Sequence, residues 1–182
     1  MLSLNSIPRE LKTNDLFLRP IGMSDTKGLF AMLSDPLSMK YWSDPPIASI
    51  DDAKIVLQKD TESDERGDSM CWAVMLDGHE TMIGKCILFQ FSQANRRAEI
   101  GYILNREYWG QGLMRQALEA VIDFAFTTLE LHRIEADVDA DNGASLAILE
   151  RLGFKREGLF KDRWNVYGEW QDSVMLGLLN TD

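Results

Sequence analysis

The chain has 182 residues, of which 45% are apolar, and this predicts one domain over residues 1–182 with a buried core. Its formal net charge of −10, without any Lys/Arg cluster, argues against nucleic-acid binding and favours a cationic partner. The first fifteen residues are charged and no run approaches the ~20 apolar residues of a membrane span, so we expect a cytoplasmic protein that does not enter a membrane.

Strand and helix patterns alternate along the first half of the chain. We expect a helix that begins at Ser24 as its N-cap, and a second helix in which Ser49 and Asp52 form a capping box. The predicted elements of this half are a strand over residues 15–20, helices over 25–35 and 49–60, and a hairpin of strands over 69–76 and 81–91.

The second half continues the alternation. Its predicted elements are a strand over residues 97–104, helices over 113–128 and 143–154, a strand over 132–139, and two strands within 164–179 around a turn at Gly168. The short helix over 143–154 is expected to end at Gly153. A long antiparallel set followed by one strand, helix, strand unit predicts an α/β fold with a mixed sheet covered by helices.

Two cysteines, Cys71 and Cys86, each lie in an apolar strand pattern and are interpreted as buried free thiols. Neither has a nearby histidine at a metal-binding spacing, so no metal site is expected.

A glycine turn joins the strand over residues 97–104 to the helix over residues 113–128. Gly110 and Gly112 in "EYWGQGLMRQA" allow a sharp turn, and the following helix offers unpaired N–H groups that bind anions. The alternative is that the glycines only shape a loop. No GxxxxGK[ST] motif is present, and a GxGxxG motif would need glycine at Arg115. A dinucleotide-binding oxidoreductase, with Asp137 or Asp139 on the ribose, stays open as an alternative.

The segments "EIGYIL", "YWGQGLMRQALEAVIDFAF" and "NGASLAILERLGFKREG" resemble the GNAT acetyltransferases, and within them the Rim-type branch of ribosomal-protein serine and alanine N-acetyltransferases. The resemblance covers nearly the whole chain and is strongest over residues 97–158. It implies a central, mostly antiparallel sheet of about seven strands, with one parallel pair splayed at the acetyl-CoA site and helices on both faces.

The resemblance also implies acetyl-CoA as co-substrate, without a metal. Backbone groups of Ile103 and Leu104, together with Asn142, would contact the pantetheine arm, although Asn142 also suits a helix N-cap. The pyrophosphate would be bound by backbone amides of the turn, namely those of Gly110, Gln111, Gly112, Leu113, Met114 and Arg115. Trp109 and Met114 depart from the general Q/RxxGxG/A pattern of the family.

Family members transfer the acetyl group by direct attack of the amine in a ternary complex, so no nucleophilic Cys or Ser is required. Glu99 is the candidate base, with a solvated or salt-bridged carboxylate beside Arg96 and Arg97 as the alternative. Many relatives have a Tyr acid where this chain has Leu149. The Rim-type branch suggests Ser145 instead, which is also an ordinary residue for a first helical turn.

The acceptor is predicted to be an amine of low pKa. At pH ~7.4, deprotonating a lysine side chain costs about 4 kcal/mol, whereas an α-amine costs about 0.5 kcal/mol. A protein N-terminus is therefore favoured, while polyamines and other small amines stay open. The candidate acceptor-binding residues are Tyr41, Trp42, Trp164 and Tyr167, which could equally be packing residues.

Two further alternatives remain. One is a catalytically silent acyl-CoA-binding sensor or interaction module, which the absence of a Tyr at Leu149 favours. The other concerns assembly, since relatives are often dimers and the tail hairpin could pair two copies of the chain.

Overall fold

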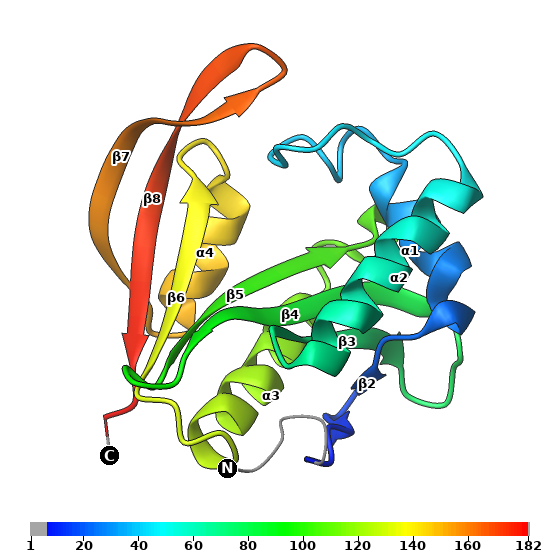
Figure 1. Cartoon of the computed structure of the whole chain (residues 1–182), viewed down its shortest axis with the longest axis horizontal. Helices are drawn as coiled ribbons and strands as arrows, with labels where there is room; N and C mark the ends of the chain where they lie inside the picture. Colours follow the sequence, from blue (N-terminus) through cyan, green and yellow to red (C-terminus); the bar gives the residue numbers. More distant parts are fainter. Residues whose placement is uncertain (1–6, 182) are drawn as a thin grey trace.

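The computed structural model describes residues 7–181, which form an eight-stranded mixed sheet with helices on both faces (Figure 1). The strands are β1 (Leu11–Lys12), β2 (Leu16–Pro20), β3 (Ser69–Leu76), β4 (Met82–Ser92), β5 (Arg97–Leu104), β6 (Arg133–Asp139), β7 (Lys155–Val166) and β8 (Glu169–Leu179). The helices are α1 (Thr26–Leu33), α2 (Ile50–Arg66), α3 (Leu113–Thr127) and α4 (Gly143–Arg151), with short 3-10 turns η2 (Met23–Asp25) and η3 (Arg106–Tyr108). No helix in this part of the chain is long and apolar enough to cross a membrane.

The strand order is β1-β2-β3-β4-β5-β6-β8-β7, and neighbouring strands are antiparallel except β5 and β6. The parallel pair is short: it joins Arg97 to Arg133, Ala98 to Ile134 and Glu99 to Glu135. Beyond these pairs the two strands diverge, as Figure 1 shows. Residues 100–104 of β5 and 136–139 of β6 do not pair with each other. We call this place, where the two strands separate, the β5/β6 split.

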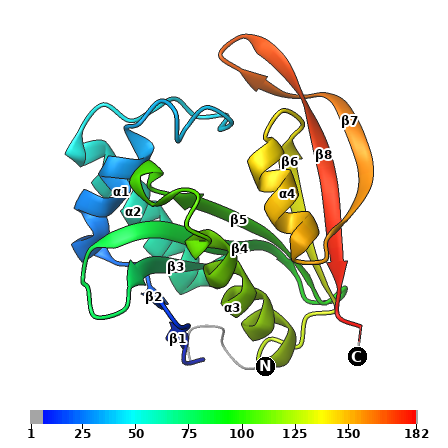
Figure 2. The ribbon, with the colours of Figure 1, turned by 180° about the vertical axis from the view of Figure 1, so that it is seen from behind.

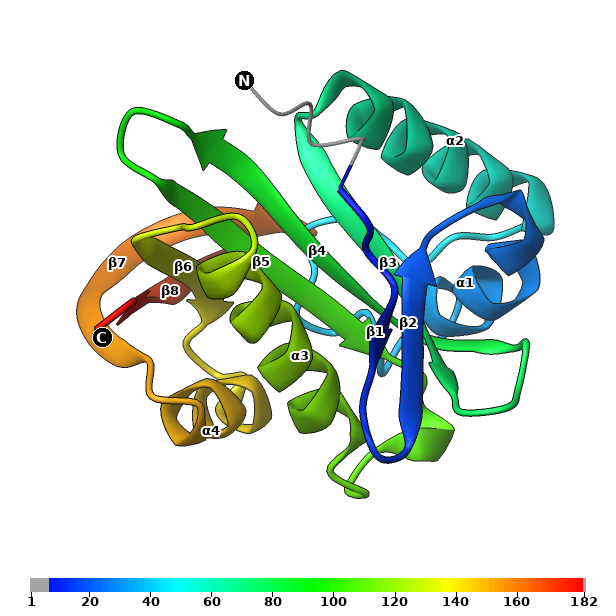
Figure 3. The ribbon, with the colours of Figure 1, turned by 90° about the horizontal axis from the view of Figure 1, so that it is seen from below.

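Helices cover the two faces of the sheet in sequence order, with α1 and α2 on one face and α3 and α4 on the other (Figures 2 and 3). Successive side chains of β3 point to opposite faces of the sheet and therefore pack into both apolar layers. Trp72 packs edge-on against Phe124 of α3, with ring centroids 5.6 Å apart. Cys71 and Ala73 point the other way, into the cluster that contains Leu29 and Leu57 of α1 and α2. Each helix buries the apolar stripe that its sequence predicted.

Most elements confirm the sequence predictions. The strand over 97–104 agrees at both ends, Ser49 and Asp52 form the predicted capping box, and Gly153 follows α4 with φ +96°. The expected mixed sheet with one splayed parallel pair is confirmed, and the two-residue strand β1 raises the strand number from about seven to eight.

The predicted N-cap at Ser24 is wrong. Ser24 lies inside η2, and α1 begins after Asp25. The Asp25 carboxylate instead accepts from the Gly22 amide at 2.9 Å and pairs with Arg19 at 2.8 Å. The ion pair with Arg19 of β2 therefore fixes where the first helix starts. Capping rules consider only the residues next to the helix end and do not include Arg19.

Helix α1 approaches β4 very closely at Gly28. A Cβ atom there would lie 2.4 Å from the carbonyl oxygen of Met82 and 2.8 Å from its Cβ. Only glycine allows this packing, and the contact sets the position of α1 on the sheet.

We expect Gly28→Val to lower the free energy of unfolding by about 2 kcal/mol, since the added atoms force α1 away from the backbone of β4. The matched control is Gly22→Val, where a Cβ would meet nothing within 4 Å, and its effect should stay within about 0.5 kcal/mol. Urea unfolding of both variants measures the difference. Equal stability of the two variants would contradict the packing argument.

Candidate active site

A cleft of about 1000 Å³ lies at the β5/β6 split. Its lining includes Glu99 and Gly101 from one face of β5, and Ile100 and Tyr102 from the other. Residues of α2 and of α4 also line it. Because both faces of the sheet contribute, the cleft passes through the sheet where β5 and β6 no longer pair.

The glycine turn ends beside this split, at the N-terminus of α3. Gly110 and Gly112 have φ of +74° and +76°, and a Cβ at either would meet nothing within 4 Å. The amides of Leu113, Met114 and Arg115 belong to the first helical turn and have no intrahelical acceptor, and no other group in residues 7–181 accepts from them. The turn thus presents open backbone donors and a partial positive charge, as an anion requires.

The backbone of β5 offers alternating groups to the split. The Asn105 amide donates to the Ile83 carbonyl at 2.8 Å. Backbone groups alternate in direction along an antiparallel strand, so the N–H and C=O of Ile103 point toward β4, and those of Tyr102 and Leu104 point toward the split. The Leu104 carbonyl accepts from Trp109 Nε1 at 2.8 Å. Of the two predicted backbone contacts, the backbone groups of Leu104 therefore face the split, whereas those of Ile103 face β4 and its side chain lines the cleft.

Two hydroxyl groups meet on the α3 and α4 side of the cleft. The Tyr102 hydroxyl is hydrogen-bonded to the Ser145 hydroxyl. Ser145 lies in the first turn of α4, where its amide donates to Asn142 Oδ1 at 3.1 Å, so Asn142 is the N-cap. Burial raises the pKa of Tyr102 above its usual value, so the phenol stays protonated. Asn142, Ser145 and Tyr102 all line the cleft.

Glu99 lies on the opposite face, and its carboxylate has no hydrogen bond or ion pair with any residue in 7–181. Its neighbours are engaged elsewhere: Arg97 pairs with Glu135, and Arg96 Nε donates to the Glu130 carbonyl at 2.8 Å. Burial is the largest cause that raises the pKa of Glu99, to about 7, and the charges of Asp137 and Glu135 act in the same direction. The charges of Arg163 and Arg97 oppose them.

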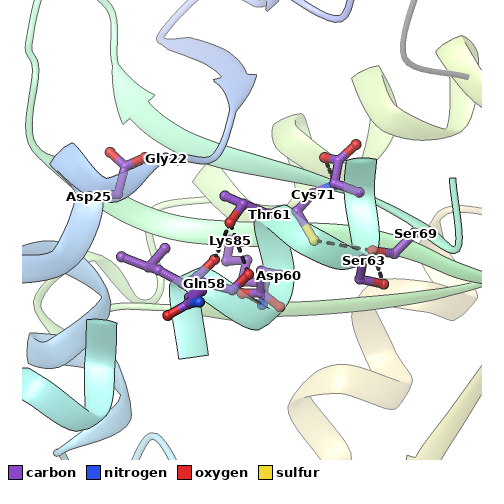
Figure 4. A network of polar contacts seen from close by, with 11 residues as sticks. Gly22, Asp25, Gln58, Asp60, Thr61, Ser63, Ser69, Cys71 and Lys85 are labelled. Atoms are coloured by element: carbon purple, nitrogen blue, oxygen red, sulfur yellow. Dashed lines mark hydrogen bonds and ion pairs between the residues drawn. The ribbon is translucent and has the colours of Figure 1, made fainter. Parts of the chain in front are cut away.

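Helix α2 and strands β3 and β4 form a polar wall on the same side as Glu99 (Figure 4). Lys85 of β4 pairs with Asp60 of α2, and the side chains are only 13% and 15% exposed. Ser63 and Ser69 hydroxyls bond each other at 3.0 Å.

Both cysteines are buried free thiols, as the sequence predicted. Burial raises the pKa of Cys71 and of Cys86 to about 12. Both thiols therefore stay protonated, which leaves them poor nucleophiles.

Three of the four predicted acceptor-binding aromatics, Tyr41, Trp42 and Trp164, line the cleft. Tyr167 lies at the tip of the β7–β8 hairpin, where its hydroxyl donates to the Asp44 carbonyl at 3.0 Å. This bond connects the β7–β8 hairpin to the loop between α1 and α2.

Tyr102 is not among the site residues predicted from the sequence, although its hydroxyl is bonded to that of Ser145. A polar tip on the apolar face of β5, directly before the glycine turn, was the available signal. Leu149, where many relatives have a Tyr, is fully buried. Asp137 and Asp139, weighed above as ribose ligands, line the cleft whereas Gly110 and Gly112 do not.

Residues 15–155 match the acetyltransferase (GNAT) domain family. An uncharacterized N-acetyltransferase p20 from Bacillus licheniformis is 34% identical over 172 residues, which is 94% of this chain and 97% of that protein. A spermidine N(1)-acetyltransferase from Vibrio cholerae is 26% identical over 92% of this chain and 95% of that protein.

Solved structures share the fold. The ribosomal L7/L12 α-N-protein acetyltransferase RimL, in complex with coenzyme A, superposes with a TM-score of 0.85 at 23% identity, covering 94% of this chain and 98% of that one. The family match spans most of the chain, and the splayed sheet, the glycine turn and the cleft occur together. The chain belongs to the GNAT family and is an N-acetyltransferase.

Proposed function

We propose that this enzyme transfers the acetyl group of acetyl-CoA to a primary amine, and that a protein N-terminal α-amine is its preferred acceptor, as in the Rim-type branch. The observation that carries the proposal is the division of groups at the β5/β6 split. Open amides and a hydroxyl pair lie toward α3 and α4, and an unpaired carboxylate of raised pKa lies on the other face.

Acetyl-CoA suits the α3 side of the split. The amides of Leu113, Met114 and Arg115 would bind the pyrophosphate, with Gly110, Gln111 and Gly112 leaving room for its approach. The pantetheine arm would then follow Leu104 and Asn142 into the cleft. This arrangement brings the thioester to the hydroxyl groups of Tyr102 and Ser145.

The acceptor enters from the side of Glu99. Glu99 takes a proton from the ammonium group, and the neutral nitrogen forms a bond to the thioester carbonyl carbon. A backbone N–H near Leu104 stabilises the oxyanion. The C–S bond then breaks, and the nitrogen loses its extra proton to water as the amide forms. The thiolate takes the proton of Ser145 Oγ, and a proton from water restores Ser145 through its hydrogen bond to Tyr102, so both hydroxyl groups end protonated.

The pKa of Glu99 favours an α-amine. Transfer of a proton from an α-amine of pKa near 7.8 to a carboxylate of pKa about 7 costs about 1 kcal/mol. The same transfer from a lysine side chain costs about 5 kcal/mol. Small amines and polyamines stay as the second acceptor class, and the reaction is proposed to take place in the cytoplasm. A homodimer formed through the exposed tail hairpin remains a prediction.

Calorimetric titration with acetyl-CoA tests the co-substrate. We expect saturable binding that Gly112→Asp abolishes, because a carboxylate there repels the pyrophosphate. The matched control is Gly78→Asp in the β3–β4 turn, where φ is +78° and the space is equally open, and this variant should bind as the unmodified protein does. Absence of binding to the unmodified protein would sink the proposal. Binding without turnover of any amine would favour the sensor alternative.

The pH dependence of kcat/KM with an N-terminal alanine peptide tests the proton route. Activity should rise as pH increases through about 7, because only ionised Glu99 accepts a proton. Glu99→Gln should lower the rate by about 10²-fold and move this limb up to about 7.8, the pKa of the peptide's own α-amine, because the variant can use only amine that is already neutral. Ser145→Ala should lower kcat while the limb remains. A Glu99→Gln enzyme with the normal rate and limb would show that another base, such as water, is used.

A further inference from the structure

Asp137, in the middle of β6, carries a charged oxygen without a partner. Its side chain is only 6% exposed and lines the cleft. Its Oδ1 atom is buried and makes no hydrogen bond to any described residue. A buried carboxylate oxygen is costly to leave unpaired, so a missing donor is expected there.

The other oxygen of Asp137 has two weak partners. Arg163 Nε and Trp164 Nε1, both from β7, lie 3.3 Å from Oδ2, which is beyond the usual range for such bonds. The Arg163 side chain is 43% exposed, and its guanidinium also lies over the rings of Phe160 and Trp164, at 5.2 and 5.4 Å. Arg163 can therefore leave Asp137 and keep favourable contacts on its own strand.

The charges around Asp137 are one cation short. The charges of Asp137 and Glu135 both raise the pKa of Glu99. Glu135 already pairs with Arg97 and Arg133. Arg133 is shared with Glu157. Four carboxylates thus face three guanidinium groups, and Glu99 and Asp137 are the two that lack a close partner.

We propose that Asp137 binds the ammonium group of the acceptor amine, which displaces Arg163 and is held beside Glu99. This inference rests on the proposed function and names the residue that receives its cationic substrate. The bound ammonium then gives one proton to Glu99 and reacts as the neutral amine. Arg163 acts as an internal cation that occupies Asp137 until the substrate arrives.

Calorimetry with two probes tests this assignment, each titrated into the free protein and into the protein saturated with CoA. The probes are an alanine tripeptide amide with a free N-terminus and spermidine; the N-acetylated tripeptide amide is the neutral reference. Asp137→Asn should weaken binding of the charged probe at least about tenfold. Arg163→Gln should tighten it or leave it unchanged, because a competing cation is removed. Asp172→Asn, which removes a carboxylate of β8 outside the cleft lining, is the matched control and should have no effect.

A purely structural role for Asp137 predicts a different pattern. If the pair only holds the hairpin, Asp137→Asn and Arg163→Gln weaken binding alike, and this result would overturn the proposal. So would unchanged binding to Asp137→Asn, or no binding of either charged probe to the unmodified protein. Loss of CoA binding alone would instead refute the acetyl-transfer proposal, because the amine titration of the free protein does not depend on CoA. Thermal unfolding of each variant shows that the fold is intact.

Discussion

Hydrogen bonding between β5 and β6 ends after three residue pairs, and the site depends on this early end. Backbone groups that leave a sheet must find other partners. The Leu104 carbonyl finds one in the Trp109 indole. At the same place the side chain of Tyr102 bonds Ser145 of α4 through its hydroxyl. A fully paired sheet would have separated the two faces, whereas the split lets groups from both faces act on one substrate.

The two sides of the split differ in charge, and this difference assigns their roles. Helix dipole, amides and hydroxyl groups on the α3 and α4 side suit an anionic, thiol-bearing donor. Carboxylates on the other side suit a cation. The raised pKa of Glu99 arises because burial and neighbouring negative charge act together, and the same negative charge would attract the amine that we propose Glu99 deprotonates.

Local signals were enough to predict the helices, the glycine turn and most strands, since periodicity and capping act within a few residues. They missed β1 and the first nine residues of β7, which begins at Lys155 and not within residues 164–179. β5 and the capping box of α2 follow directly from such signals. The pairing of Tyr102 with Ser145 joins residues 43 apart, and that of Asp137 with Arg163 joins residues 26 apart. These contacts depend on register and on how β7 bends over β6, which no local pattern specifies. The mistaken cap at Ser24 has the same origin, because Arg19 captures Asp25.

The hydrogen bond from Tyr167 to Asp44 links segments 123 residues apart through one contact at the protein surface. Tyr167 is 59% exposed, so water can replace Asp44 at little cost. The hairpin and the α1–α2 loop can therefore separate without disturbing either apolar layer. The bond is therefore a surface connection whose loss would cost little of the free energy of folding, whereas the position of each segment depends on its own packing.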